Sequence, residues 1–489
     1  MKVLFCVSEA VPLAKTGGLA DVGGALPAAL MELGTDVRLA LPRYRGIGLA
    51  GWRPAGTVEV QLGAERLPVA ILDGKMPDTG VPAWLVDQPR LFNRAGLYGE
   101  GGKDYPDNLA RFASWCRALL TWLERQSWQP DLIHCNDWQT ALVPAIIAAG
   151  QAAQTATLLT IHNLAYQGLF PAEQFPMTGL PASMYTIAGL EFWGQVNLLK
   201  GGLMLADLLS TVSETYALEI QTPEFGAGLD GVLRDRANDL FGILNGVDYR
   251  AWDPAHDPLI PARYTVDNLS GKRACKAHLQ QEFGLTADPA IPLIGMVTRL
   301  ADQKGLDLVA AILDELFAAG TQLVVLGTGD PRYERMFVDA ARQHPRAAGV
   351  RIGFVNGLAH RIEAGADIFL MPSRYEPSGL NQLYSLRYGT VPVVRRTGGL
   401  ADSIRDATPQ AVETGTANGF VFIDYTPRAL LLAIHRALTA FRDPVTWREL
   451  QRVGMTADFS WAESAKKYVG LYERTIARSQ ERAERVGDR

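Results

Sequence analysis

The chain of 489 residues is too long for one ordinary hydrophobic core, which predicts two or three domains. Hydrophobic residues make up 48% and charged residues 20%, a composition typical of globular proteins, and no low-complexity segment is present. The formal net charge of -5 argues against a general surface for nucleic acid or for an anionic membrane, so we expect neither as a partner.

We expect the chain to act in the cytoplasm, where it is made. The apolar start, Val3 to Val7, has only the length of a strand and meets Glu9 and Lys15 too soon for a signal peptide. No uncharged apolar stretch is long enough to span a bilayer. The cysteines form neither a CxxC pair nor a metal-ligand spacing, so we interpret them as reduced thiols that behave as small buried hydrophobic residues. They are Cys6, Cys116, Cys135 and Cys275.

Short apolar runs alternate with helical patterns from end to end, which indicates an α/β fold of parallel sheets covered by helices. One helical core stripe recurs at three- and four-residue spacing: Leu109, Phe112, Trp115, Cys116, Leu119, Leu120 and Leu123. The first series of predicted strands is Lys2–Val7, Asp36–Leu41, Asp131–Cys135, Ala156–His162 and Leu208–Ser213. The second is Pro292–Thr298, Gln322–Gly327, Val350–Val355, Ile368–Ser373, Val391–Arg396 and Gly419–Ile423. Pro254, Pro258 and Pro261 interrupt both periodicities between the two series, so we place a domain boundary there.

A basic-Thr-Gly-Gly element occurs once in each half. Lys15-Thr-Gly-Gly-Leu-Ala-Asp21 returns almost letter for letter as Arg396-Thr-Gly-Gly-Leu-Ala-Asp402. Each copy follows a strand and opens a helix, whose first N–H groups attract an anion. The glycines let the backbone approach a ligand, because no Cβ stands in the way. The alternative is an ordinary strand-to-helix turn, which glycine also serves.

Further polar residues follow predicted strands, where open parallel sheets bind their ligands. Arg299-Leu-Ala-Asp-Gln-Lys304-Gly305 brings two cations to one strand end, where they would converge on phosphate oxygens unless Asp302 and Asp307 pair with them. In Arg374-Tyr-Glu376-Pro-Ser-Gly379, the carboxylate of Glu376 is placed to accept hydrogen bonds from sugar hydroxyls, or is an exposed loop acid. In the first half, His134-Cys-Asn-Asp137-Trp138 and Ile161-His162-Asn163 also end strands, although a lone His is more often structural.

The chain lacks two sequence motifs that are typical of other enzyme classes. No two aspartates are separated by one residue, so the DxD motif of metal-dependent sugar transferases is missing, and we expect no metal and no cofactor. Gly327-Thr-Gly329 lacks the third glycine of a dinucleotide fingerprint. Its absence weakens the alternative hypothesis that the chain is an NAD-linked oxidoreductase. A two-lobed sugar-binding protein without catalysis would not need this many cations. Neither alternative accounts for the repeated basic-Thr-Gly-Gly element.

Together, these segments closely resemble bacterial glycogen synthases and plant starch synthases. The matching segments are Lys15 to Val22, Asp104 to Asn108, Thr160 to Gly168, Thr211 to Tyr216, Thr222 to Gly226, Gly242 to Asp248, Arg299 to Gly305, Glu376 to Leu380, Arg396 to Asp402 and Asp458 to Trp461. The resemblance implies the GT-B architecture, with two Rossmann-like domains and a deep interdomain cleft. It places an amino-terminal domain at 1–245, a nucleotide-sugar domain at 246–457, and at 458–489 a helix returning to the first domain plus a polar tail.

The resemblance also implies the substrates: ADP-glucose and the non-reducing end of an α-1,4-glucan such as glycogen or a maltooligosaccharide. It leaves the oligomeric state open. Ser378 stands where the family usually has Cys, and Tyr384 replaces the second acid of the E-x7-E pattern of related retaining transferases.

Roles follow for the candidate residues. We expect Arg299 and Lys304 to stabilise the charge that develops on the phosphate. By resemblance, Glu376 and His162 bind the glucosyl hydroxyls and Asp137 lies near the reacting centre. The predicted substrate-binding set further comprises Lys15, Gly17, Gly18, Asn163, Asn245, Gly379, Thr397, Gly398 and Gly399.

Overall fold

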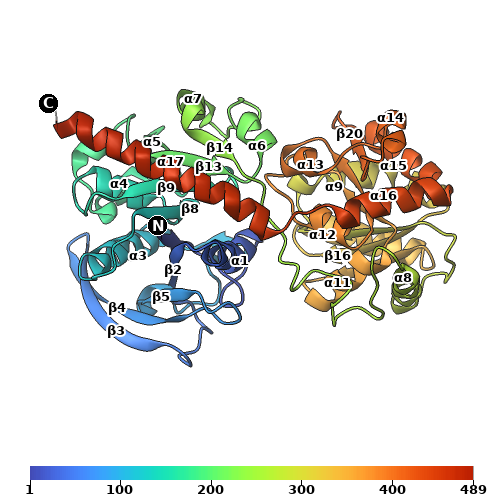
Figure 1. The fold of residues 1–489 in the computed structure, drawn as a ribbon, viewed down its shortest axis with the longest axis horizontal. Helices are drawn as coiled ribbons and strands as arrows, with labels where there is room; N and C mark the ends of the chain where they lie inside the picture. Colours follow the sequence, from blue (N-terminus) through green and yellow to red (C-terminus); the bar gives the residue numbers. More distant parts are fainter. Residues whose placement is uncertain (488–489) are drawn as a thin grey trace. The chain divides into compact units, whose positions relative to one another are not determined.

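The computed structural model describes residues 1–487, which form two compact α/β units (Figure 1). Unit 1 comprises Met1–Gly246 and Trp461–Arg489, and unit 2 comprises Val247–Ser460. The predicted boundaries at 245/246 and 457/458 lie one and three residues before these divisions. Within residues 1–487, no helix is both long and apolar enough to cross a membrane.

Unit 1 is built on a nine-stranded sheet with the order β14-β13-β9-β8-β1-β2-β5-β4-β3. Its parallel part contains every strand predicted for this half, with ends that differ by one or two residues. These strands are β1 (Lys2–Cys6), β2 (Asp36–Pro42), β8 (Leu132–Asn136), β9 (Ala156–Ile161) and β13 (Leu208–Thr211), and β14 (Leu240–Gly242) extends the edge. The carboxyl ends of the parallel strands share one edge, which brings their following loops together.

The other edge of the same sheet departs from the predicted all-parallel pattern. β3 (Arg53–Leu62) and β4 (Glu65–Lys75) pair antiparallel, and β4 pairs antiparallel with β5 (Pro82–Asp87). β5 then joins β2 in parallel. On β3, Val58, Val60 and Leu62 are buried while Glu59 and Gln61 are exposed, the alternation of a strand with one covered face.

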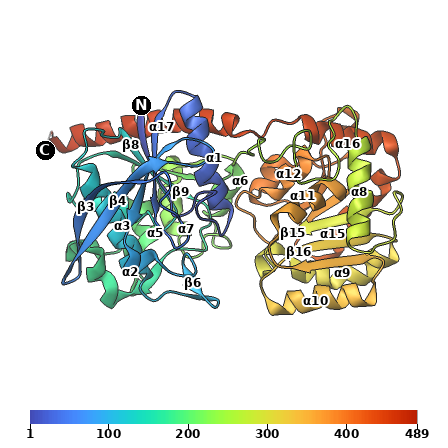
Figure 2. The ribbon, with the colours of Figure 1, turned by 90° about the horizontal axis from the view of Figure 1, so that it is seen from below.

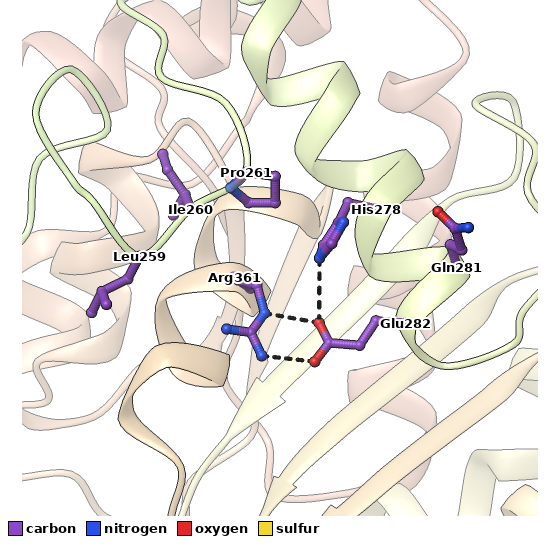
Figure 3. A pocket seen from close by; sticks show the side chains of 7 residues that line it. All are labelled: Leu259, Ile260, Pro261, His278, Gln281, Glu282 and Arg361. Atoms are coloured by element: carbon purple, nitrogen blue, oxygen red, sulfur yellow. Dashed lines mark hydrogen bonds and ion pairs between the residues drawn. The ribbon is translucent and has the colours of Figure 1, made fainter.

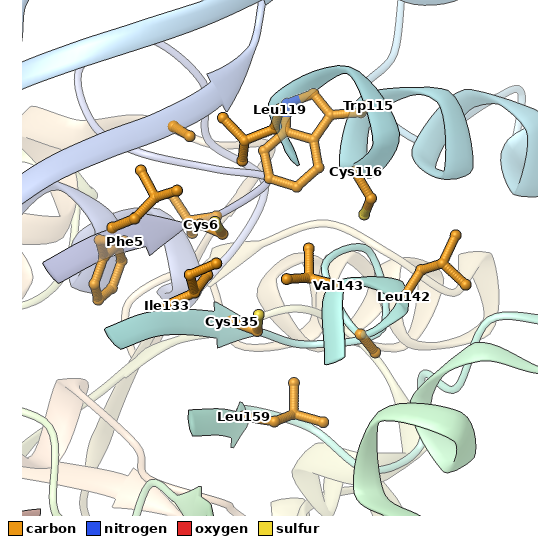
Figure 4. Close-up of a cluster of buried hydrophobic side chains, with 14 of the residues drawn as sticks. Phe5, Cys6, Trp115, Cys116, Leu119, Ile133, Cys135, Leu142, Val143 and Leu159 are labelled. Carbon is orange, nitrogen blue, oxygen red and sulfur yellow. The ribbon is translucent and has the colours of Figure 1, made fainter. Parts of the chain in front are cut away.

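Helices cover both faces of this sheet. They are α1 (Gly18–Glu32), α2 (Pro89–Phe92), α3 (Asn108–Leu123), α4 (Leu142–Ala148), α5 (Leu198–Leu205), α6 (Glu214–Glu219) and α7 (Asp230–Asp235), with short 3-10 turns at Ala172–Thr178, Ala182–Met184 and Ala237–Asp239. All seven residues of the predicted stripe on α3 are buried, as predicted. Figure 4 shows Cys6, Cys116 and Cys135 among Trp115, Leu119 and Ile133.

The four cysteines are free and buried, which confirms their interpretation as thiols in the core. Burial raises the pKa of Cys6 and of Cys116, so these thiols stay protonated and unreactive.

Two small sheets complete unit 1. β6 (Gly99–Glu100) and β7 (Lys103–Asp104) form a hairpin. β10 (Leu169–Pro171), β12 (Gln195–Asn197) and β11 (Glu191–Phe192) form a three-stranded antiparallel sheet. Neither was predicted, because strands of two or three residues are too short to show a period.

Unit 2 is a six-stranded, fully parallel sheet with the order β17-β16-β15-β18-β19-β20. All six strands were predicted, although β17 begins two residues earlier than the predicted Val350. The strands are β15 (Leu293–Val297), β16 (Gln322–Gly327), β17 (Ala348–Ile352), β18 (Ile368–Met371), β19 (Val391–Arg395) and β20 (Phe420–Phe422).

Successive residues of β16 enter different cores, because side chains alternate across a sheet. Leu323 and Val325 pack with one set of helices, and Val324 and Leu326 with the other. Figure 2 shows the helices around β15 and β16. The helices of unit 2 are α8 (Ser270–Glu282), α9 (Leu306–Ala318), α10 (Pro331–Gln343), α11 (Asn356–Gly365), α12 (Asn381–Arg387), α13 (Gly398–Ser403), α14 (Pro409–Glu413), α15 (Pro427–Phe441) and α16 (Pro444–Thr456), with a 3-10 turn at Asp302–Lys304.

The last helix, α17 (Trp461–Gly487), packs against α1 and β9 of unit 1 (Figure 1). Tyr472 Oη and His134 Nδ1 lie 2.8 Å apart, and His134 Nε2 lies 2.6 Å from Thr160 Oγ1, so His134 joins this helix to the sheet. Burial lowers the pKa of His134 well below its usual value, so it stays neutral and serves a structural role. The predicted polar tail is helical as far as Gly487, and residues 488–489 lie outside the described part.

Candidate active site

The centre of the candidate site in unit 2 is an ion pair. Lys304 Nζ lies 2.6 Å from Glu376 Oε2, and Ser373 Oγ donates to the same carboxylate oxygen at 2.9 Å. Both side chains are largely buried. Since a buried charge is costly without a partner, each residue stabilises the other. The sequence analysis treated Lys304 and Glu376 as separate groups for phosphate and sugar, and the structure brings them into direct contact.

A glycine fixes the turn that carries Lys304. Gly305 has φ 69°, and a Cβ on it would lie 1.9 Å from the carbonyl oxygen of Pro372. Only glycine fits this position. The Lys304 turn therefore lies directly against the segment that leads into Glu376.

Arg299 lies in the same group of strand-end loops. It follows β15, and its Nη2 is 3.4 Å from Gln303 Oε1. Leu300 pairs with Gly329 in the loop after β16, so the first two loops are joined by backbone hydrogen bonds. The loop after β17 carries Phe354, whose ring is 72% exposed. The sequence analysis placed Phe354 inside the predicted strand Val350–Val355, but β17 ends at Ile352, so Phe354 lies in the loop that follows.

The second basic-Thr-Gly-Gly copy packs closely against the turn that carries Glu376. A Cβ on Gly398 would lie 1.9 Å from the carbonyl oxygen of Glu376, and one on Gly399 would lie 1.9 Å from that of Ser378. The Gly399 N–H donates to the Glu376 carbonyl at 3.1 Å. These glycines therefore allow α13 to pack against the Glu376 turn, and the Gly399 amide is used within the protein. The predicted contact of Gly398 and Gly399 with the substrate stays a prediction.

In unit 1, the first copy is organised around Glu9, a buried residue that the sequence analysis did not select. Its carboxylate accepts hydrogen bonds from the Thr16 N–H at 2.5 Å, the Thr16 hydroxyl at 2.6 Å, the Gly17 N–H at 3.1 Å and the Tyr98 hydroxyl at 2.7 Å. In this structure the loop binds a carboxylate of the protein itself, and the predicted contact with a substrate anion stays a prediction. The Gly17 amide is thus occupied, and Gly18, the first residue of α1, stays the candidate for a ligand contact.

Lys15 lies on the same loop. Its ammonium is 2.7 Å from Asp21 Oδ1 and its side chain is 40% exposed. An exposed pair of this kind is weak, because water screens it. Lys15 can therefore exchange Asp21 for a more strongly charged group.

Asp137 and His162 follow the neighbouring strands β8 and β9, and they contact each other. Asp137 adopts φ 57°, an uncommon conformation that Asp tolerates better than most residues. Its Oδ1 accepts the backbone N–H of His162 at 2.7 Å. Burial raises the pKa of Asp137 to about 7, against the lowering effect of backbone N–H groups of His162 and Asn163. This carboxyl can therefore change charge near neutral pH.

The ring of His162 is neutral and has a defined tautomer. Burial lowers its pKa to about 3. Its Nε2 lies 2.8 Å from Asn136 Oδ1, and the Asn136 amide nitrogen donates to the Cys6 carbonyl, which fixes Oδ1 as an acceptor. Nε2 must therefore carry the proton, and Nδ1 is the acceptor of the ring.

The remaining predicted residues differ in their contacts. Asn163 Oδ1 accepts the Ala165 N–H at 3.1 Å, a local turn contact. Asn245 Oδ1 is buried without a hydrogen-bond partner within residues 1–487, and so is Ser378 Oγ on the Glu376 turn. Since a buried polar atom without a partner is costly, a ligand or an ordered water is the natural partner for each. Gly379 has φ 66° on the turn that follows Glu376, and Thr397 directly precedes α13 without a side-chain hydrogen bond that caps this helix.

Tyr384 occupies the place of the missing second acid, and it has a packing role. Its ring stacks on Trp252 at 3.9 Å, and Trp252 stacks on His360 at 3.7 Å. Tyr384 therefore contributes to an aromatic stack in unit 2.

A cavity of about 570 Å³ lies elsewhere in unit 2, and none of the predicted site residues lines it. Figure 3 shows its lining: Leu259, Ile260, Pro261, His278, Gln281, Glu282 and Arg361. Arg361 forms two hydrogen bonds with Glu282, at 2.7 and 2.8 Å, so its charges are already paired. Among residues 1–487, no group of three or more His, Cys, Asp and Glu side chains has an arrangement that could hold a metal ion.

Comparison with known proteins gives the family. Residues 2–235 match the model of the starch synthase catalytic domain, and residues 280–449 match that of the glycosyl transferases group 1. The chain is 50% identical over 482 residues to glycogen synthase 1 of Methylococcus capsulatus, covering 98% of this chain and 97% of that protein. It is 52% identical over 485 residues to the glycogen synthase of Anaeromyxobacter dehalogenans, covering 98% and 100%.

Solved structures of related enzymes have a similar fold. The catalytic domain of starch synthase IV from Arabidopsis thaliana, bound to ADP and acarbose, superposes with a TM-score of 0.89 at 33% identity, covering 97% of this chain and 99% of that one. Sucrose-phosphate synthase from Thermosynechococcus elongatus shares the fold, with a TM-score of 0.60 at 17% identity. The fold is therefore the two-domain α/β GT-B architecture, and the chain is a glycosyltransferase that belongs to the glycogen synthase family.

Proposed function

We propose that the chain transfers glucose from ADP-glucose to the non-reducing end of an α-1,4-glucan, with retention of the anomeric configuration. The observation that carries this proposal is the identity of about half of all residues with glycogen synthases over nearly the full chain. The ADP bound to the similar starch synthase IV supports an adenine nucleotide as the leaving group. The substrate pair is thus a nucleotide sugar and a glucan.

The first function that we assign to the site is to stabilise the charge on the leaving phosphate. As the bond between the sugar and the diphosphate breaks, negative charge grows on the leaving phosphate. Arg299 and Lys304 lie at strand ends of unit 2, and we assign them to this charge. We also assign Lys15 to a phosphate oxygen of the donor, because its weak pair with Asp21 can be exchanged for a more strongly charged group. Fixed cations stabilise the developing charge without reorganisation, so we propose that no metal and no cofactor are needed.

The second function that we assign to the site is to bind the glucosyl group. Glu376 is held in place by Lys304 and Ser373, which leaves its carboxylate oriented to accept a sugar hydroxyl. His162 offers Nδ1 as a neutral acceptor. A neutral ring suits this position, since an imidazolium would repel the positive charge that develops on the sugar.

Asp137 is the residue that we place nearest that positive charge. Its pKa of about 7 lets it ionise when a cation forms beside it. We prefer a front-face reaction to a covalent intermediate. In this step the bond from C1 to the phosphate oxygen breaks, the bond from C1 to the acceptor oxygen forms on the same face, and the acceptor proton passes to the leaving phosphate.

Product analysis tests the proposal. The protein, ADP-glucose and a maltooligosaccharide with a labelled reducing end should yield chains longer by one glucose, with the label retained and every new linkage α-1,4. Growth at the labelled end, or β-linked products, would contradict it. Mass spectrometry of a rapidly quenched reaction tests the front-face step. A glucosyl ester on Asp137 or Glu376 would contradict this step, which has no covalent intermediate.

A further inference from the structure

The hairpin that joins β11 to β12 exposes an unusually large apolar side chain. Its two-residue turn is Trp193-Gly194, with φ 52° and φ 77°. Both residues have positive φ, as the tight hairpin turn of this type requires. Trp193 is 86% exposed, while Phe192 and Val196 beside it pack into the core of unit 1. The turn thus directs one large ring outward at a backbone conformation that Trp rarely adopts.

Specific contacts hold this turn in place. The Gly194 N–H donates to Glu191 Oε1 at 2.8 Å, which closes the hairpin across its tip. Beneath it, the buried ammonium of Lys200 donates to the carbonyl oxygens of Ile187 at 2.6 Å and Gly189 at 2.8 Å. The side chain of Ile187 is 81% exposed. An internal lysine therefore supports the segment that presents Ile187 and Trp193.

The base of the hairpin is bonded to the loop that carries His162. Asn197 Nδ2 donates to Gln167 Oε1 at 2.7 Å, and the Leu198 N–H donates to the Gly168 carbonyl at 3.1 Å. Gly168 lies against the ring of Trp138, the neighbour of Asp137. The exposed ring therefore belongs to a hairpin whose base is hydrogen-bonded to the loop that carries His162.

The chemistry of this surface suits a carbohydrate better than a protein. The face of a pyranose ring presents C–H groups whose partial positive charge meets the negative face of an aromatic ring. Glu191 and Gln195 flank the turn and can bond sugar hydroxyls. A second copy of the chain would need roughly 800 Å² on each partner for a stable interface, which two protruding side chains cannot supply.

We propose that the Trp193 hairpin binds the α-1,4-glucan at glucosyl units away from the reacting end. The Trp193 ring stacks on one glucosyl unit, and Glu191 and Gln195 accept and donate hydrogen bonds to its hydroxyls. The proposal rests on the proposed function, because it takes the acceptor to be a polymer that extends beyond the catalytic loop.

The test compares W193A, W193F and L218A with the parent protein. Leu218 is a matched control, since it is 69% exposed in the same unit and lies on α6. W193A should raise the KM for glycogen roughly two- to tenfold, the range expected for one aromatic contact. It should leave kcat and the KM for maltotriose unchanged, because a short acceptor does not reach the hairpin. W193F should recover most of the effect, and L218A should show none.

Native electrophoresis in gels with and without glycogen gives a readout independent of turnover. W193A should be retarded less by glycogen than the parent and L218A proteins. Equal retardation, with equal KM values for glycogen, would overturn this proposal while leaving the proposed function intact. An absence of any transfer from ADP-glucose would overturn the proposed function instead. A change of sedimentation coefficient in W193A would show that the ring joins two copies of the chain, which also overturns the proposal.

Discussion

Lys304 and Glu376 are 72 residues apart in sequence, and their side chains meet at 2.6 Å. The pair joins the group assigned to the phosphate to the group assigned to the sugar. Neither charge is isolated in the ligand-free protein, so each keeps its position before the substrate arrives. Preorganised charges of this kind supply most of their stabilisation at the transition state, because they do not need to move.

The cations should be separable by their effects on stability. R299A and K304A should each lower kcat by about 10²–10³, the usual effect of losing one charge-stabilising donor. K304A should also lower the melting temperature, since it leaves the buried Glu376 carboxylate without its cation. R299A should melt like the parent. R342A, which removes an exposed cation of α10, is the control. Near-normal turnover in R299A would return Arg299 to the role of a surface residue.

The two basic-Thr-Gly-Gly copies should respond differently to alanine. G398A places a Cβ 1.9 Å from the Glu376 carbonyl at φ 43°, so it should cost about 3 kcal/mol of stability and most of the activity. G17A meets no atom within 4 Å and has φ -155°, so its melting temperature should match that of the parent.

The activity of G17A then reports on the ligand. A drop of about tenfold in a variant that melts normally would mean that substrate closely approaches this loop. Full activity would mean that Gly17 serves only the turn, with its amide bonded to Glu9. Thermal melting and steady-state rates on the same preparations decide between these outcomes.

The pH dependence should follow Asp137. Its carboxyl is neutral below a pKa of about 7 and charged above it. If the charged form stabilises the sugar cation, kcat/KM should rise as the pH passes through about 7. D137N should be strongly impaired, and its residual rate should lack this rise. His162 should contribute no inflection between pH 5 and 8, because its pKa is lowered to about 3. The same inflection in D137N would assign it to another group.

Chelation should leave the enzyme active. The sequence has no DxD motif, and we have assigned Arg299 and Lys304 to the positive charge that a divalent ion supplies in other sugar transferases. Dialysis against EDTA, followed by assays with and without added Mg²⁺, should give the same rate. Loss of activity that a divalent ion restores would show that the diphosphate is held in another way.

The sequence predicted the features that repeat along the chain. Parallel strands that are buried on both faces are continuous apolar runs. The sequence therefore predicted β1, β8, β9 and the six strands of the unit 2 sheet, together with the polar residues that follow them. The antiparallel strands β3 and β4 were missed even though Val58 and Val60 alternate with polar neighbours. The Trp193 hairpin could not be found, because a two-residue strand has no period.

Contacts between residues far apart in the sequence could not be predicted either. Nothing local reveals that Glu9 accepts the Gly17 amide or that Gly398 lies against the Glu376 carbonyl, since both depend on tertiary packing. The sequence selected glycines for a ligand, and the structure uses Gly398 and Gly399 for close packing. The mutual contacts of the selected residues, such as the pair of Lys304 and Glu376, therefore required coordinates.

The central claim concerns the donor and the acceptor, and one assay tests both. Release of nucleoside diphosphate is measured with glycogen present or absent, from ADP-glucose or from UDP-glucose. We predict rapid release of ADP from ADP-glucose that depends on glycogen and is matched by glucose incorporated into the polymer, with slow release from UDP-glucose. Release of ADP at the same rate without glycogen, or faster transfer from UDP-glucose than from ADP-glucose, would contradict the account.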